Sequence, residues 1–294
     1  MARILIVAIL KPMSRLPLSV LYIFSDVLFF FLYYLFPYRK KVVIKNLQNS
    51  FPDKNKKEVQ KICRKFYKHL CDLLVETIKI PGLSEIEARK RLIVENPEDL
   101  NNYYARGENM IVIGGHYNNW ELAAAVTPLY LKHDCLGIYR PLKNAAFNQY
   151  MVESRSKFGL QLVPKRAIVK HIHPSAGKRP FLTFFLSDQV PKKSSSTYWT
   201  QFLNQETGVP VGGGVLANRY HYPVVYGRMT KEKRGYYKLR FKILDSEPQS
   251  SSPEEILEKY TRELENQILQ RAEFWLWTHK RWKRKRPKEE NSSN

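Results

Sequence analysis

A histidine and a glutamate five positions apart, His116 and Glu121, are the pair in this sequence that we consider first for general acid–base chemistry. On one continuous helix, residues five apart point about 140° away from each other, because each residue turns about 100°. Here a strand at 111–113 and two glycines precede a helix that Asn118 or Asn119 would cap, so a turn separates the pair. A carboxylate that fixes the imidazole tautomer leaves the other ring nitrogen free to act as a general base. We therefore expect His116 to accept a proton and Glu121 to hold it in place.

The motif His-Tyr-Asn-Asn-Trp-Glu at 116–121 resembles the active-site motif of the bacterial lipid A biosynthesis acyltransferases, the lauroyl and myristoyl transferases. These enzymes belong to the wider glycerolipid acyltransferase superfamily. A His-x4-Glu spacing recurs by chance in many proteins, so the resemblance depends on further blocks. Such blocks occur in the family's order over roughly residues 40–285.

The most specific block is Trp-Leu-Trp-Thr-His-Lys-Arg-Trp-Lys at 275–283, which resembles the family's C-terminal Trp-x-Trp-x-His-x-Arg-Trp-Lys signature. It departs from the family just upstream, where Ala-Glu-Phe at 272–274 replaces Pro-Glu-Gln. Another block, Val-x-x-Asn-Leu-x-x-x-Phe-Pro at 43–52, resembles the segment after the family's membrane helix. The segment 199–204 lacks the family's paired phenylalanines and glycine, which leaves the acyl chain length open.

Five further residues are expected at the substrate site. Arg140, in a Tyr-Arg-Pro run after a strand, resembles the family's second block and could bind a phosphate. Arg155 falls where the family has another arginine, and Asn119 belongs to the active-site motif. Asp188 and Gln189 follow an apolar strand and resemble the family's Asp-Gln block. We expect Asp188 to orient a basic residue or to contact the acceptor, with a plain strand-end cap as the alternative.

Charge indicates an acidic partner. The chain has 294 residues and a formal net charge of +22, which favours nucleic acid, an anionic membrane surface or an acidic protein. A basic run from Lys280 to Lys288 lies beside tryptophans, a combination suited to an anionic membrane. Its three cysteines are too few for a disulfide framework and form no metal-ligand cluster, which fits a reducing compartment.

Residues 16–36 form an apolar segment of membrane-helix length, with Asp26 at its middle. On an insertion scale the apolar residues contribute about −7 kcal/mol and Asp26 returns about +3 kcal/mol, so the segment either spans the membrane or lies in its interface. Arg39, Lys40 and Lys41 follow, which places the rest of the chain on the cytoplasmic side. A cleaved signal peptide and a buried aromatic helix are the competing interpretations.

The remaining chain alternates between strand and helix patterns after a helical region at 42–80. The strand patterns lie at 91–94, 110–115, 134–138, 160–163, 180–186, 222–230 and 236–243. The helix patterns lie at 97–106, 119–131, 144–157, 166–175, 209–220 and 253–272. We therefore predict an α/β fold with a mixed, mostly parallel sheet covered by helices on both faces, resembling the glycerolipid acyltransferases. The predicted units are a membrane anchor at 1–40, an acyltransferase domain at 41–287 and a disordered tail at 288–294.

The resemblance implies an enzyme that moves a fatty acyl chain from the thioester of acyl carrier protein to a hydroxyl of a lipid A precursor. This reaction belongs to lipopolysaccharide biosynthesis, on the cytoplasmic face of the bacterial inner membrane, and implies no cofactor and no metal. Acylation of a lysophospholipid or an aminolipid is the nearest alternative. A basic, membrane-tethered nucleic-acid binder is the alternative of another class, although no recognition motif accompanies the charge and we expect no nucleic acid partner.

Overall fold

A seven-stranded sheet forms the centre of the computed structural model, which describes residues 6–174, 179–191 and 197–287. Its strands are β1 (Leu92–Val94), β2 (Met110–Gly114), β3 (Asp134–Tyr139), β4 (Gln161–Pro164), β5 (Phe181–Leu186), β8 (Val224–Lys233) and β9 (Tyr236–Asp245). They lie in the order β1-β9-β8-β2-β5-β3-β4, and only the β8–β9 pair is antiparallel. The predicted mixed, mostly parallel sheet is confirmed.

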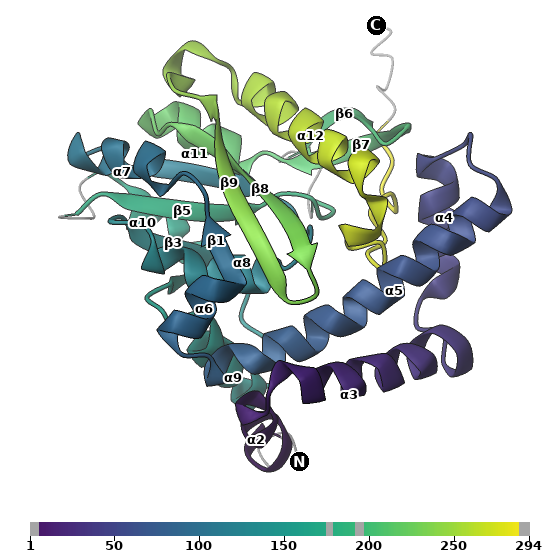
Figure 1. Cartoon of the computed structure of the whole chain (residues 1–294). Coiled ribbons are helices and arrows are strands. Elements are labelled where there is room, and N and C mark those ends of the chain that lie inside the picture. The colour runs from purple at the N-terminus through teal and green to yellow at the C-terminus, as the bar shows by residue number, and fades with distance from the viewer. Residues whose placement is uncertain (1–5, 175–178, 192–196, 288–294) are drawn as a thin grey trace, which may run out of the picture.

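Two layers of helices cover the sheet (Figure 1). Side chains of β2 alternate between two cores, as the period of a strand requires. Ile111 and Ile113 pack in the core under α11 (Gly212–Tyr220) and α12 (Pro253–Gln270). Met110 and Val112 pack in the opposite core. That second core includes residues of α6 (Glu85–Arg91), α7 (Pro97–Ala105) and α8 (Trp120–Val126).

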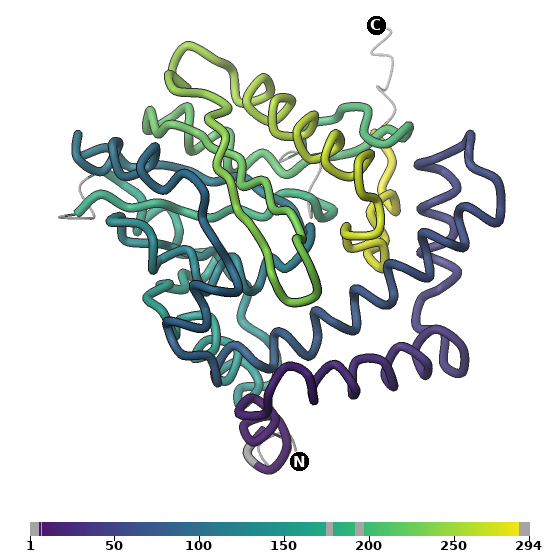
Figure 2. Tube along the Cα trace, in the orientation of Figure 1, coloured from purple at the N-terminus to yellow at the C-terminus, as the bar shows by residue number. Residues whose placement is uncertain are grey.

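Helices from the first 80 residues pack side by side along one flank of this body (Figures 1 and 2). They comprise α2 (Lys11–Arg15), α3 (Leu18–Phe30), a π-helical turn (Phe31–Leu35), α4 (Lys40–Ser50) and α5 (Lys56–Lys79). The segment Leu18–Leu35 is long and apolar enough to cross a membrane. It nevertheless packs along α5, and Ser25 donates a hydrogen bond to Asp72 of that helix at 2.8 Å. Its central charge, Asp26, pairs with Arg234 at 2.7 Å.

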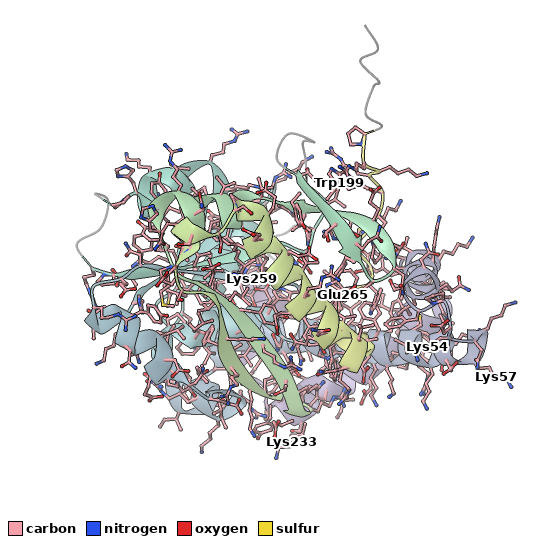
Figure 3. All side chains as sticks on the ribbon, turned by 90° about the horizontal axis from the view of Figure 1, so that it is seen from above. Lys54, Lys57, Trp199, Lys233, Lys259 and Glu265 are labelled. Carbon is pink, nitrogen blue, oxygen red and sulfur yellow. The ribbon has the colours of Figure 1, made fainter. Side chains whose placement is uncertain are left out.

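The segment at 199–204 forms part of a hairpin that the sequence patterns did not indicate. Its strands are β6 (Thr197–Phe202) and β7 (Gln205–Pro210), which lie beside α12 (Figure 3). Leu203 and Asn204 join them with φ of 51° and 60°, the left-handed conformation that a tight two-residue hairpin requires. The helix predicted at 209–220 was therefore wrong at its start, because residues up to Pro210 belong to the hairpin.

Other boundaries shift in smaller ways. The helix predicted at 166–175 is the single short helix α10 (Ile168–Ile172), after a 3-10 turn, and its predicted end lies outside the described residues. The helix pattern at 144–157 corresponds to α9 (Ala145–Arg155). The strand predicted at 222–230 continues to Lys233, so the turn to β9 is short and includes the left-handed Gly235. The predicted tail at 288–294 lies outside the described residues.

Candidate active site

His116 and Asp188 lie at the carboxyl ends of two neighbouring parallel strands. His116 follows β2, Asp188 follows β5, and the Ser187 amide donates to the Gly114 carbonyl at 2.9 Å. The carboxyl ends of parallel strands form the usual ligand edge of an open α/β sheet. A Cβ atom at Gly115 would lie 3.2 Å from Oδ2 of Asp188, so the glycine permits the turn to approach the carboxylate closely.

Asp188 holds His116 through two hydrogen bonds and accepts a third from Trp275. Oδ1 of Asp188 lies 2.6 Å from Nδ1 of His116, and Oδ2 accepts the His116 backbone N–H at 2.7 Å. Oδ2 also accepts the indole N–H of Trp275 at 2.9 Å. The carboxylate is buried, with 4% of the residue exposed. Asp188 therefore lies against a basic side chain, a contact compatible with the orienting role that we expected for it.

This contact changes the acidity of both partners in opposite directions. Burial lowers the pKa of His116, but the charge and hydrogen bond of Asp188 outweigh it, so the pKa is raised overall. Burial likewise opposes ionisation of Asp188, but His116 and Trp275 lower the pKa of the Asp188 carboxyl to about 2. Asp188 is thus ionised throughout the physiological range, and it stabilises a proton on the imidazole.

The second imidazole nitrogen faces Gln189. With Nδ1–H donating to Asp188, Nε2 of His116 carries a lone pair and accepts from the Gln189 amide at 3.3 Å. Trp120 packs edge-on against the imidazole, with ring centroids 5.2 Å apart. The structure thus brings together His116, Asp188 and Gln189, three residues that we expected at the site from the sequence.

Glu121 has a different partner from the one we expected. Arg155, in the last turn of α9, donates from Nε and Nη2 to the two Glu121 oxygens at 2.7 and 2.6 Å. The first turn of α8 directs Glu121 toward α9, whereas Asp188 occupies Nδ1 of His116. Glu121 therefore acts on His116 through its charge, which raises the pKa of the imidazole, and Arg155 opposes this effect.

Asn119 and the turn amides are bound within the protein. Oδ1 of Asn119 accepts the Leu122 N–H at 2.9 Å and caps α8, while its Nδ2 donates to Glu76 at 2.6 Å. The Asn118 N–H donates to the Phe274 carbonyl at 2.8 Å. These bonds leave the 1%-exposed Asn119 with a structural task, in contrast to the expected substrate contact. The backbone N–H groups of Asn118 and His116 are both occupied, by the Phe274 carbonyl and by Asp188, so neither is available to bind an anion.

Arg140 lies exposed directly after β3, at the same edge of the sheet as His116. Within the described ranges, its guanidinium has neither an ion pair nor a hydrogen bond. Across the same described residues, no group of three or more His, Cys, Asp or Glu side chains is arranged to hold a metal ion.

The C-terminal block forms a wall of the site. Leu276 donates its N–H to the His116 carbonyl at 3.1 Å, and Tyr117 forms a β-bridge with Trp275. Asn46 in turn donates to the carbonyls of Trp277 and His279 at 2.9 and 3.0 Å. The two blocks at 43–52 and 275–283 therefore contact each other, and the second also contacts the turn that carries His116.

Sequence reasoning missed Trp275 as a donor to Asp188 and Arg281 as a buried cation. Arg281 is 4% exposed, and burial lowers its pKa to about 10 although Asp188 opposes the shift. It lines a small pocket with Asp188, Phe202 and Tyr260. The block at 275–283, which contains both residues, was the only signal in the sequence. A motif does not show which side chains its residues contact.

Comparison with known proteins identifies the family of this chain. The family model described as bacterial lipid A biosynthesis acyltransferase matches residues 1–284. A lipid A biosynthesis palmitoleoyltransferase of Escherichia coli (strain K12) is 24% identical over 249 residues, which cover 83% of this chain and 79% of that protein. A lipid A biosynthesis acyltransferase of Shigella flexneri matches with the same identity and coverage. The chain therefore belongs to the bacterial lipid A biosynthesis acyltransferase family and is an acyltransferase.

Proposed function

We propose that this protein transfers a fatty acyl chain from the thioester of acyl carrier protein to a hydroxyl of a lipid A precursor, with His116 as general base. The observation that carries the proposal is the 2.6 Å contact between Nδ1 of His116 and Oδ1 of Asp188. It fixes the tautomer whose Nε2 can take a proton, at the ligand edge of the sheet.

The chemistry follows from that tautomer. Nε2 of His116 takes the proton of the acceptor hydroxyl as its oxygen attacks the thioester carbonyl carbon. When the tetrahedral intermediate collapses, the C–S bond breaks and the imidazolium returns the proton to the thiolate of the carrier. Asp188 remains ionised and stabilises the imidazolium, because its pKa is about 2. The sequence contains no Gly-x-Ser-x-Gly elbow, which favours direct transfer over a serine acyl-enzyme.

Substrate binding is assigned to residues around Nε2. The Gln189 amide bonds to Nε2 of His116, so the acceptor hydroxyl has to displace it, and the amide is then free to hold the reacting oxygen. Arg140 is exposed at the same edge and is suited to a phosphate or a developing oxyanion. The Glu121–Arg155 pair lies near enough to influence the imidazole, and its bidentate geometry holds Arg155 in one orientation.

The lipid acceptor implies a membrane surface, and α3 supplies an apolar face for it. Large apolar residues on this segment are turned outward, among them Ile23 (64% exposed), Val27 (51%) and Phe30 (50%). Because α3 packs along α5 and Asp26 pairs with Arg234, we propose that this helix lies in the membrane interface and does not cross the bilayer. The anionic surface at the cytoplasmic face of the inner membrane would complement the net charge of +22.

The test is acyl transfer by the purified full-length protein. Acyl carrier protein loaded with lauroyl, myristoyl or palmitoleoyl chains is the donor, and a lipid A precursor, a lysophospholipid and an aminolipid are the acceptors. We expect mass spectrometry to show the lipid A precursor gaining one acyl chain, at a kcat/KM well above that for the other acceptors. Preferred acylation of the lysophospholipid or the aminolipid would overturn this choice of acceptor.

A further inference from the structure

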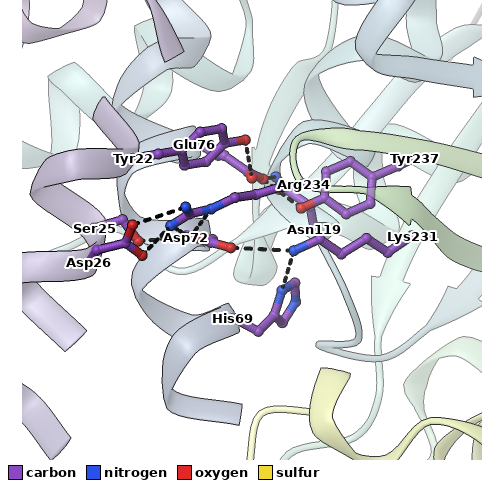
Figure 4. A network of polar contacts seen from close by, with 10 residues as sticks. All are labelled: Tyr22, Ser25, Asp26, His69, Asp72, Glu76, Asn119, Lys231, Arg234 and Tyr237. Carbon is purple, nitrogen blue, oxygen red and sulfur yellow. Dashed lines mark hydrogen bonds and ion pairs between the residues drawn. The ribbon is translucent and has the colours of Figure 1, made fainter. Parts of the chain in front are cut away.

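A network of polar side chains joins the membrane-facing helix to the catalytic turn (Figure 4). It is built from α3, from α5, from the β8–β9 hairpin and from the residue that caps α8. Its members are Tyr22, Ser25 and Asp26 on α3; His69, Asp72 and Glu76 on α5; Lys231, Arg234 and Tyr237 on the hairpin; and Asn119. The catalytic mechanism uses none of these side chains directly, so their arrangement needs another explanation.

Glu76 lies at the centre of the network. Its Oε1 accepts the hydroxyl of Tyr22 at 2.8 Å, and its Oε2 accepts the Asn119 amide and the Tyr237 hydroxyl, each at 2.6 Å. The residue is 5% exposed, and among the described residues no basic side chain forms an ion pair with it. Three neutral donors from three different segments therefore solvate one buried carboxylate, which makes each donor important.

The contact with Glu76 decides how the Asn119 amide is oriented. A side-chain amide has a donor end and an acceptor end. Because Nδ2 faces the Glu76 carboxylate, Oδ1 must face the other way, where it accepts the Leu122 N–H at 2.9 Å and caps α8. Asn119 lies between His116 and Glu121, so its orientation fixes the turn that carries both residues.

The other half of the network binds α3 to α5 and to the β8–β9 hairpin. Asp72 accepts hydrogen bonds from Ser25 at 2.8 Å and from Nη2 of Arg234 at 2.6 Å. Arg234 also reaches Asp26, and Lys231 lies 3.4 Å from Asp72. One turn further along α5, Tyr22 of α3 reaches Glu76. A displacement of α3 from α5 would therefore remove a donor from the carboxylate that orients Asn119.

We propose that Glu76 is a positioning residue for the catalytic turn and that α3, through Tyr22, is part of the positioning machinery. The inference rests on the proposed function and names further residues that support it. It gives the predicted membrane anchor at 1–40 a second role. Acyl transfer should then depend on the seating of α3 against α5, and not only on attachment to the membrane.

The first experiment exchanges the amide and the carboxylate. Asn119→Asp places two carboxylates in contact, and we expect kcat to fall about 10- to 100-fold because Glu76 loses one donor and the two like charges repel each other. Glu76→Gln alone should lower kcat less than Asn119→Asp, because its carbonyl oxygen can still accept from Asn119 and a tyrosine hydroxyl can accept from the new amide. In the double variant Glu76→Gln/Asn119→Asp, the new amide donates to the new carboxylate, which still caps α8.

The readouts are kcat, KM and the unfolding midpoint of the full-length protein. We expect the double variant to recover kcat to within about tenfold of the wild type, while KM stays close to the wild-type value in all three variants. If Glu76→Gln fails to rescue folded Asn119→Asp, or if Asn119→Asp retains wild-type kcat, the positioning role is wrong. A purely structural contact would change the unfolding midpoint without this pattern of loss and rescue.

The second experiment isolates the contribution of α3. Tyr22→Phe removes only the hydroxyl that donates to Glu76, and Tyr34→Phe removes an exposed hydroxyl from the same apolar segment. Both proteins should remain in the membrane fraction, with kcat about three- to tenfold lower for Tyr22→Phe and unchanged for Tyr34→Phe. Equal kcat values would contradict the coupling.

The two proposals fail separately. If the wild-type enzyme transfers acyl chains but Tyr22→Phe and the exchange variants behave as the wild type, only the positioning role is lost. If the wild-type enzyme does not acylate the lipid A precursor, the proposed function itself is overturned.

Discussion

Replacing Asp188 with asparagine should reverse the tautomer of His116. Oδ2 of Asp188 accepts two N–H groups, from the His116 backbone and from Trp275, whereas Oδ1 meets only Nδ1 of His116. An asparagine has one carbonyl oxygen, which is best placed where the two donors converge. Its amide nitrogen then faces Nδ1, which must accept, so the proton moves to Nε2. The nitrogen that should take the proton of the acceptor is then already protonated.

The expected loss is large. An amide in place of the carboxylate of a buried carboxylate–imidazole pair lowers kcat by about four orders of magnitude when it imposes the wrong tautomer. Because Asp188 contacts the base and not the position where we place the acyl chain, KM should change little. The geometry of the turn should survive, since asparagine has nearly the same shape as aspartate.

The assay is steady-state acyl transfer from acyl carrier protein by purified Asp188→Asn, with Glu121→Gln as the matched control. Glu121→Gln should lose less activity, because Glu121 binds Arg155 and not Nδ1 of His116. Circular dichroism checks that both variants are folded. Activity of Asp188→Asn within about tenfold of the wild type, together with a collapse of Glu121→Gln, would refute this reasoning and make Glu121 the orienting carboxylate.

Three further predictions concern pH, charge and stability. His116 must be neutral to act as a base and its pKa is raised, so kcat/KM should fall with decreasing pH through a midpoint above the ordinary value of about 6.5; a midpoint below that value would contradict the pairing with Asp188. Replacing the exposed Lys283, Arg284, Lys285 and Arg286 with glutamine should raise KM and weaken its salt dependence while kcat holds, because such charges are screened over about 8 Å at 0.15 M salt; equal salt dependence in mutant and wild type would exclude a docking role. Asn46→Ala should lower the free energy of unfolding by about 1–3 kcal/mol, measured by urea denaturation, because one buried and one partly buried carbonyl lose their donor; an unchanged midpoint would show that the contact between the two blocks contributes little.

The sheet could be predicted from the sequence because its signals are local. Apolar strands such as 110–114 and 181–186 alternate with helical patterns, and glycines mark the turn before His116. The β6–β7 hairpin escaped notice because its strands are largely polar and its turn depends on left-handed Leu203 and Asn204. A leucine rarely adopts the left-handed conformation, so the sequence gives no sign of a tight turn at this position.

The choice between carboxylates could not be made from spacing. Glu121 lies close to His116 in the chain, but the first turn of α8 directs it to Arg155. Asp188 is 72 residues away in sequence and becomes the partner because β2 and β5 are adjacent in the sheet. Asp26 is a second case in which the partner is distant in sequence. The free-energy cost of its charge within an apolar segment is offset by Arg234, 208 residues further along the chain.

The proposed function depends most directly on His116, and acyl transfer by purified His116→Ala tests it. The wild-type protein should add one acyl chain from acyl carrier protein to the lipid A precursor. The variant should be folded, bind the membrane normally and turn over at least about two to three orders of magnitude more slowly, the loss typical of a missing general base. Near-normal transfer by His116→Ala would contradict the account.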